Sequence, residues 1–363
     1  MKKWLLSLCM VLALAACKDE KKAADTRPVI KMGAILPLTG DLAYIGVSAQ
    51  RALQLALEKW NKKDTKFKYE LIVEDVAFDA KTVAIATNKL INRDKIRVLF
   101  SVFSMGANVA TPITEKAKII HMASAYGSDS AKGFYSFNNL TQYENTTDTM
   151  LKELKRRGVK SIGLLASNNF GSSQQTDILE KKIIEDGTIK LIGKTLYNPG
   201  TIDFRMIIQK MTAKETPELF YIDGLTPDAT LVAKYLQEII GKINLTTIND
   251  FIETPKRAEF EGLWFVESAS ATEEFSKEFE ARFGEPVFLC GANSYDNMDL
   301  FIEACETAAK GDTVKNEDIV RQLLTVKDRK GAIGKFFIDS EGIVQSSANV
   351  KVIKNGKAVD VEE

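Results

Sequence analysis

The chain has 363 residues, of which 45% are hydrophobic and 27% are charged, a composition typical of a globular protein long enough to form two hydrophobic cores. The 49 basic and 49 acidic residues balance, and no basic stripe with interleaved aromatic residues occurs. Nucleic-acid binding is therefore not expected.

The N-terminus has the pattern of a secretory signal peptide. Two lysines precede an apolar run at residues 4–14, which is too short for a permanent membrane span, and small residues follow it. The sequence Leu-Ala-Ala-Cys at 14–17 resembles the lipobox of bacterial lipoproteins. This resemblance implies that residues 1–16 are removed, that Cys17 is lipidated at a membrane, and that residues 17–28 form a polar tether. An unmodified cysteine in an ordinary signal peptide is the alternative.

Two cysteines remain after this processing, Cys290 and Cys305. A helix is predicted at 293–309, and its rise of 1.5 Å per residue separates the two positions by roughly 20 Å. A disulfide could form in an oxidising compartment, but we expect two reduced core cysteines.

From residue 29 onward, short apolar runs alternate with helical patterns. The first series predicts strands at 29–36, 69–76, 97–103 and 118–123 and helices at 49–60, 79–91 and 105–117, the second of which Asp79 caps. This alternation requires right-handed crossovers and a parallel sheet.

A second series begins after residue 143. It predicts strands at 161–166, 189–196, 218–222 and 242–248 and helices at 144–157, 172–185, 204–211 and 228–240. The remaining segments are helices at 273–283, 293–309 and 316–324 and strands at 336–339 and 348–353. They hold too few strands for a third unit, so the chain is predicted to be an α/β protein with two parallel sheets.

Ligands of open parallel sheets bind beyond the carboxyl ends of the strands, where helix N-termini present free N–H groups. The loops at these ends are rich in Gly, Ser, Asn, Tyr and Asp, which suits a polar solute in a preformed cleft. These loops are at 37–46, 78–79, 104–107, 124–130, 167–171, 223–227 and 249–253.

Equipment for catalysis is sparse. The single histidine, His121, lies in an apolar strand, where a structural histidine is expected rather than a general base. The sequence contains no Cys/His metal cluster, no phosphate-binding Gly-rich loop and no dinucleotide fingerprint. We therefore expect neither enzymatic activity nor a cofactor.

Several short motifs occur in a fixed order along the chain. They are Gly-Ala-Ile-Leu-Pro-Leu-Thr-Gly at 33–40, Gly46, Ser104 eight residues before Pro112, Asn169-Phe170-Gly171, Asp203-Phe204, Glu261-Gly262 and Tyr295-Asp296. Together they resemble the type I periplasmic binding proteins, in particular the branched-chain amino-acid (Leu/Ile/Val)-binding group of ABC-transporter substrate-binding lipoproteins. The resemblance runs from about residue 30 to the end.

This resemblance implies two Rossmann-like lobes with parallel sheets, joined by a three-stranded hinge. The N-terminal lobe would comprise residues 29–143 and 272–343, and the C-terminal lobe residues 144–271 and 344–363. The chain would then cross between the lobes near residues 143, 271 and 343.

The resemblance also implies ligand-binding residues in the first lobe. Ser104 matches the serine that, with neighbouring amides, holds the ligand's α-carboxylate; the alternative is that it caps its helix. Ala125 falls where a backbone carbonyl accepts from the α-ammonium. Gly127 falls where the amino-acid binders usually carry a threonine, so Tyr126 or Ser128 would have to supply the missing hydroxyl.

Tyr44 and Ile45 fall where the first lobe touches the ligand's side chain. For Tyr44, an exposed loop aromatic is an equal alternative.

The resemblance also implies an aromatic and an acidic ligand-binding residue in the second lobe. Phe170 matches the aromatic residue that closes over the ligand, without the usual hydroxyl, and ordinary core packing is its alternative. Asp250 lies near the acidic position that pairs with the α-ammonium. Asn249 and Asp223 are rivals for that position.

The function implied is capture of a small polar solute by hinge closure and its delivery to the permease subunits of an ABC importer. The protein would act as a monomer, in the periplasm or at the cell surface. Amino acids are the default ligand, but the departures at Gly127 and Phe170 leave other carboxylates, amides and small aromatic acids open. The alternative is a lipoprotein of the same fold that senses a ligand or regulates a signalling receptor or cell-wall synthase.

Overall fold

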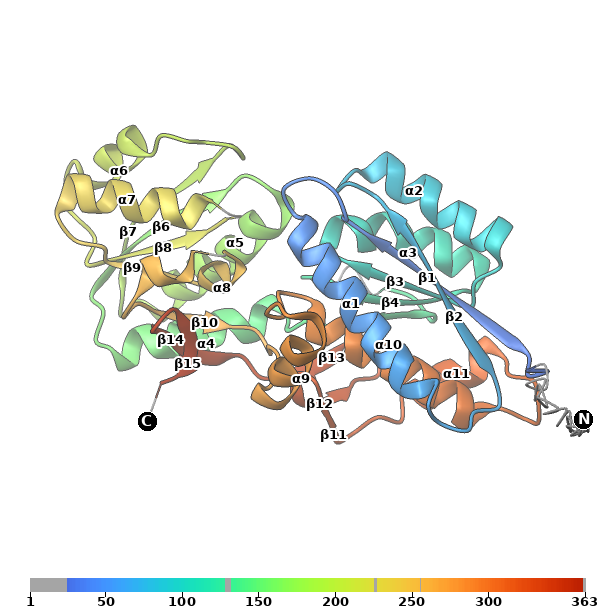
Figure 1. The fold of residues 1–363 in the computed structure, drawn as a ribbon. Helices are drawn as coiled ribbons and strands as arrows, with labels where there is room; N and C mark the ends of the chain where they lie inside the picture. The colour runs from blue at the N-terminus through green and yellow to red at the C-terminus, as the bar shows by residue number, and fades with distance from the viewer. Residues whose placement is uncertain (1–24, 128–131, 225–226, 255, 362–363) are drawn as a thin grey trace, which may run out of the picture.

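The computed structural model describes residues 25–127, 132–224, 227–254 and 256–361. Within them the chain forms two α/β lobes that lie side by side (Figure 1). The predicted signal peptide and Cys17 lie outside the described residues. No helix of the described part is long and apolar enough to cross a membrane.

The first lobe is built on a five-stranded parallel sheet of order β2-β1-β3-β4-β5. Its strands are β1 (Val29–Leu36), β2 (Lys68–Asp75), β3 (Val98–Val102), β4 (Ile120–Ser124) and β5 (Ser136–Asn138). The predicted parallel sheet is thereby confirmed. The inner strands β1, β3 and β4 are almost completely buried because helices cover both faces of the sheet.

Helices cover the two faces of this sheet (Figure 1). One face packs against α1 (Ala43–Trp60), α10 (Gly291–Ala308) and α11 (Asn316–Leu323), and the other against α2 (Ala80–Lys89) and α3 (Ser104–Ala117). The predicted cap of α2 is confirmed, because the Asp79 carboxylate accepts from the Thr82 N–H at 2.7 Å. The short π-helix Leu90–Asp94 follows α2.

The second lobe contains a four-stranded parallel sheet of order β7-β6-β8-β9. Its strands are β6 (Ser161–Ser167), β7 (Lys190–Tyr197), β8 (Leu219–Asp223) and β9 (Leu245–Thr247). The helices of this lobe are α4 (Tyr143–Arg156), α5 (Phe170–Asp186), α6 (Arg205–Thr212), α7 (Asp228–Ile240), α8 (Asp250–Glu253) and the 3-10 helix Arg257–Phe260. A bridge from Ile248 to Val266 connects this sheet to the antiparallel strands β10 (Trp264–Glu267), β14 (Asn349–Lys354) and β15 (Lys357–Asp360).

The chain passes between the two groups of elements at residues 139–142, 268–272 and 347–348. The helix α9 (Glu273–Phe283) and the antiparallel sheet of β11 (Arg329–Gly331), β12 (Gly334–Ile338) and β13 (Val344–Ser346) return to the first lobe. One buried hydroxyl links the three passages. Thr141 Oγ1 accepts from the Ala269 N–H at 2.9 Å and lies 2.9 Å from Ser346 Oγ.

The two cysteines and the histidine behave as predicted. Cys290 and Cys305 are both free and buried. The His121 ring is fully buried, with Nε2 2.8 Å from Ser101 Oγ and Nδ1 3.1 Å from Thr111 Oγ1. Burial lowers the pKa of His121 to about 4, so the ring stays neutral at pH 7 and serves as a structural hydrogen-bonding group.

Candidate ligand-binding site

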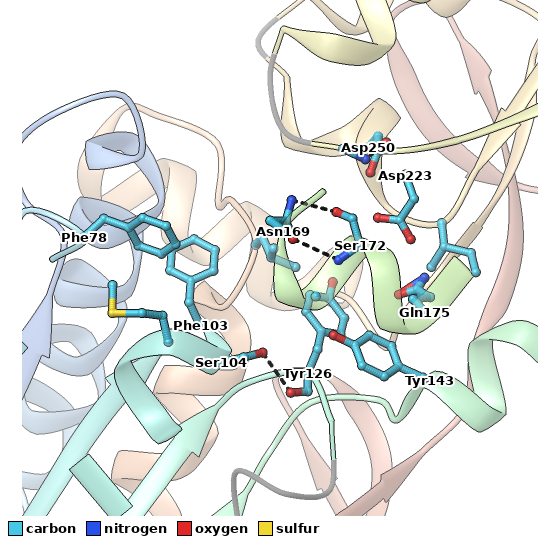
Figure 2. A pocket seen from close by; sticks show the side chains of 15 residues that line it. Phe78, Phe103, Ser104, Tyr126, Tyr143, Asn169, Ser172, Gln175, Asp223 and Asp250 are labelled. Atoms are coloured by element: carbon cyan, nitrogen blue, oxygen red, sulfur yellow. Dashed lines mark hydrogen bonds between the residues drawn. The ribbon is translucent and has the colours of Figure 1, made fainter. Parts of the chain in front are cut away.

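A cavity of about 310 Å³ lies between the lobes, at the carboxyl ends of their parallel strands, as the rule for open sheets predicts. Figure 2 shows the side chains that line it. The first lobe contributes Phe78, Phe103, Ser104, Met105, Tyr126 and Leu289, and the second lobe contributes Tyr143, Asn169, Gly171, Ser172, Gln175, Asp223, Gly224, Ile248 and Asp250.

One wall is the N-terminal end of α3. Ser104 is its first residue, and the Ser104 hydroxyl donates to the carbonyl oxygen of Tyr126 at 2.8 Å. The N-cap position is occupied by Phe103, which makes no side-chain capping bond, so the alternative of Ser104 as a helix cap is wrong. The first turn of a helix presents N–H groups without intrahelical partners and the positive end of the helix dipole. This wall therefore suits an anionic group.

The opposite wall is acidic. Asp223 ends β8 and Asp250 begins α8, and both side chains are buried. Asp223 accepts from the Tyr221 hydroxyl at 2.9 Å, and Asp250 accepts from the Gly224 N–H at 2.9 Å. Desolvation raises the pKa of Asp223 to about 7. None of the described residues that line the cavity is basic, so this wall suits a cationic group.

Gly224 lies between these two aspartates. A Cβ atom there would lie 2.3 Å from the Tyr197 hydroxyl and 2.7 Å from Asp228 Oδ2. Tyr197 donates to this Asp228 oxygen at 2.9 Å. The absence of a side chain at Gly224 lets a third buried carboxylate pack directly behind the acidic wall.

Two further polar groups of the cavity lack partners. The Tyr143 hydroxyl and the Gln175 Nε2 amide are buried and make no hydrogen bond with a described residue. Burial and the nearby Asp223 charge raise the pKa of Tyr143, so its hydroxyl remains protonated. Buried polar groups normally find partners. A bound ligand would provide them here.

The lobes also contact each other directly. The Asn249 amide donates to the Tyr126 hydroxyl, and the Tyr126 ring stacks on Tyr143 with centroids 5.4 Å apart. Asn249 is held in the left-handed region with φ of 71° and also bonds Ser268 Oγ at 2.9 Å. It therefore joins the lobes and does not line the cavity.

A second contact between the lobes lies outside the cavity lining. The guanidinium of Arg257 lies 5.6 Å from the Phe288 ring centroid, and Phe288 packs edge-to-face on Tyr44 at 5.1 Å. Tyr44 is thus a half-buried packing residue at this contact and not an exposed loop aromatic.

The structure brings Ser104, Asp223 and Asp250 together in the cavity, but it places the other predicted residues differently. Ile45 is fully buried in the first-lobe core. Ala125 is buried, and its N–H and carbonyl bond the Asn138 side chain at 3.0 and 2.7 Å.

The remaining predicted positions adjoin the cavity. Gly127 has a φ of 85°, and a Cβ there would lie 3.5 Å from the Tyr143 ring, while its neighbour Tyr126 lines the cavity. Phe170 is the first residue of α5, between the lining residues Asn169 and Gly171.

The sequence reasoning did not assign several lining residues. Phe78, Met105 and Asn169 lie in loops that it had singled out, whereas Tyr143, Gln175 and Leu289 reach the cavity from helices and connections that carried no signal.

The raised pKa of Asp223 predicts a dependence of stability on pH. Between about pH 4 and 7 the folded state holds a proton on Asp223 that the unfolded state has lost, since the ordinary pKa is 3.8. The free energy of unfolding should therefore fall as pH rises through this window, by up to about 1.4 kcal/mol per unit for one such group, and level off above it. Urea denaturation at pH 5 and 7.5 measures this loss.

Asp223→Asn should remove only the part of this pH-dependent loss of stability that Asp223 causes. Burial also raises the pKa of Asp296 to about 7, so Asp296 should still contribute in the variant. We expect a smaller loss of stability between the two pH values in Asp223→Asn than in the unmodified chain. Equal losses would show that Asp223 does not titrate in this window.

Comparison with known proteins identifies the family. Residues 29–357 match the family described as periplasmic binding protein. Curated relatives include a Leu/Ile/Val-binding protein homolog of Brucella suis, 22% identical over 223 residues, which are 57% of this chain and 54% of the relative. A Brucella abortus homolog is 21% identical over 54% of this chain and 53% of its own length. The chain thus spans about half the length of the curated relatives it matches.

Solved structures agree in fold. A leucine-binding protein of Thermotoga maritima is 19% identical, with 92% of this chain and 98% of that chain covered and a TM-score of 0.79. An isoleucine complex of a Streptococcus pneumoniae branched-chain amino-acid binding protein has 19% identity, coverage of 91% and 97% and a TM-score of 0.80. A Rhodopseudomonas palustris solute-binding protein in complex with p-hydroxybenzoic acid has 17% identity, coverage of 92% and 96% and a TM-score of 0.81.

These relatives are solute-binding proteins, in agreement with the prediction that the chain is not an enzyme. The resemblance drawn from the short sequence motifs is confirmed over nearly the whole described chain. The chain is similar to Leu/Ile/Val-binding homologs and to a leucine-binding protein, and it belongs to the periplasmic binding protein family.

Proposed function

We propose that the chain captures a small zwitterionic solute of the amino-acid type in the interlobe cavity and delivers it to an ABC importer. One observation carries this proposal: the cavity has a helix N-terminus with Ser104 on one wall and the buried Asp223 and Asp250 on the other, with no basic residue among its described lining. An α-amino acid carries a carboxylate and an ammonium group on the same carbon atom, so it can place one charged group against each wall.

The two poles act through different physical effects. The ligand's carboxylate would accept hydrogen bonds from the first-turn N–H groups of α3 and gain from the helix dipole. The ligand's ammonium would donate charge-assisted bonds to Asp250 and Asp223. The unpartnered Tyr143 hydroxyl and Gln175 amide would then complete the polar contacts.

Binding would favour the closed arrangement of the lobes, because the ligand touches both of them only when they are closed. The Asn249–Tyr126 hydrogen bond and the Arg257–Phe288 contact would add to this preference. The importer's permease would recognise the closed form. Similar solved structures include an isoleucine complex and a p-hydroxybenzoic acid complex, which supports the capture of a small solute.

We extend the proposal to location on the basis of the lipobox-like sequence. Lipidation at Cys17 would anchor the protein at a membrane, with the lobes in the periplasm or at the cell surface. Replacement of Cys17 by serine should release the protein from the membrane fraction.

Thermal denaturation of the processed chain, residues 17–363 with Cys17→Ser, tests the function. A ligand at a hundred times its Kd should add about 2.7 kcal/mol to the free energy of unfolding. We expect an α-amino acid to raise the melting temperature, and the corresponding amine and carboxylic acid, which lack one charge each, to fail. If only benzoates raise the melting temperature, the ligand is not a zwitterion. If no compound of a broad panel raises it, the sensing or regulatory function is favoured.

A further inference from the structure

Two phenylalanines at the first-lobe end of the cavity have unusual backbone conformations. Phe78 and Phe103 both line the cavity, and their rings pack edge-to-face with centroids 5.3 Å apart. Their φ angles are 55° and 65°. Such left-handed conformations disfavour residues with a Cβ and are uncommon outside glycine, asparagine and aspartate.

The type of turn formed by residues 76–79 makes the backbone conformation of Phe78 especially unfavourable. The Asp79 N–H donates to the Val76 carbonyl at 2.8 Å, and both central residues, Ala77 and Phe78, have positive φ. This is the pattern of a type I′ turn, in which glycine and asparagine are strongly preferred. A large ring at this position therefore costs conformational free energy that a glycine would avoid.

Packing within the protein does not account for this cost. The Phe78 side chain is 41% exposed, whereas Phe103 is buried in the first-lobe core. Figure 2 shows Phe78 and Phe103 on one side of the cavity, with Asp223 and Gln175 on the opposite side. Met105 and Leu289 also line the cavity, so an apolar end faces a polar end.

We propose that Phe78 and Phe103 form an aromatic subsite that selects an aromatic α-amino acid. The inference rests on the proposed function and specifies its ligand. An edge-to-face pair leaves ring faces and edges for a third ring, and aromatic rings favour such offset or perpendicular contacts. Strain of this kind is kept where it positions a functional group.

The acidic wall excludes an aromatic acid without an ammonium group. A benzoate would occupy the aromatic subsite and the α3 N-terminus, but it has no ammonium group to bond the Asp223 and Asp250 carboxylates that line the cavity. Its own negative charge would instead be repelled by these carboxylates. The ligand therefore carries a ring, a carboxylate and an ammonium.

Isothermal titration of the processed chain with L-phenylalanine, L-leucine and benzoate tests the subsite. We expect L-phenylalanine to bind more tightly than L-leucine, and benzoate not to bind. Phe78→Gly should weaken L-phenylalanine roughly five- to tenfold and L-leucine by less than about twofold. Its melting temperature should not fall, because glycine suits the left-handed turn and the lost ring is partly exposed.

Phe337→Ala is the matched control, since Phe337 is 42% exposed in the first lobe and does not line the cavity. It should change neither affinity. If L-leucine binds as tightly as L-phenylalanine, or Phe78→Gly weakens both equally, the aromatic subsite is overturned while the proposed function stands. If no amino acid binds, the proposed function itself fails. Binding of benzoate in place of amino acids would overturn both the requirement for an ammonium group and the proposal that the ligand is a zwitterion.

Discussion

Asp250→Asn should weaken the binding of an amino-acid ligand by about 2–5 kcal/mol, the typical effect of removing one partner of a buried charge pair. Asparagine is nearly isosteric with aspartate, and its Oδ1 atom can still accept from the Gly224 N–H, which now bonds Asp250 Oδ2 at 2.9 Å. The substitution therefore removes the charge that would face the ligand's ammonium and keeps the local fold. The variant's melting temperature without ligand should stay close to that of the unmodified chain.

Isothermal titration gives the affinity, and Asp228→Asn provides the matched control. Asp228 is also a buried carboxylate of the second lobe, and it accepts from the Tyr197 hydroxyl at 2.9 Å, but it does not line the cavity. We expect the control to lower the affinity by less than about 1 kcal/mol, since its charge acts only at longer range. Similar losses in the two variants would mean that the ligand senses the overall charge of the lobe and makes no contact with Asp250.

The division of the acidic wall between two aspartates follows from their surroundings. Asp223 lies deep at the end of β8 beside Tyr221, and desolvation there raises its pKa to about 7. Asp250 is the first residue of α8, which follows β9, the strand next to β8 in the sheet. The sequence alone left Asp223, Asp250 and Asn249 as rivals, and the structure separates them: both aspartates line the cavity, while the Asn249 amide joins the lobes.

Local patterns were sufficient to predict most of the fold. The bounds of β1, α7 and α9 were predicted without error, because each has a clear apolar period and a defined end, such as the glycines after α7 and α9. The strands β5, β10, β11, β13 and β15 were missed. Each has only three or four residues, which is too short for a local apolar period to be recognised.

The candidate site was predictable only in part, for a related reason. Ser104 and Asp223 could be located because residues at the carboxyl ends of parallel strands meet at one edge. Tyr143 and Gln175 reach the cavity from α4 and α5, so their positions depend on how helices and lobes pack. Ile45 was assigned from the family resemblance, yet it lies on the buried face of α1 with Ala49, where the helical period requires a core residue.

The loop that follows β1 depends on a close backbone approach at Gly46. This glycine lies in the first turn of α1, and a Cβ atom there would lie 2.0 Å from the Pro37 carbonyl oxygen and 2.6 Å from its carbon. The loop cannot easily move away, because Asp75 accepts from the Leu38 N–H at 2.9 Å and from the Thr39 hydroxyl at 2.7 Å.

Gly46→Ala should therefore lower the free energy of unfolding by about 3 kcal/mol, at the upper end of the usual cost of overpacking. Urea denaturation measures this loss, and Gly193→Ala in β7 is the matched control, since no atom lies within 4 Å of a Cβ there. The control should be neutral or slightly stabilising, because alanine restricts the unfolded chain. Equal stability of the two variants would mean that the loop yields at little cost. A large loss confined to Gly46→Ala would explain in physical terms why a glycine follows the Gly-Ala-Ile-Leu-Pro segment. Because Gly46 has no side chain, α1 can begin directly against the loop at the end of β1.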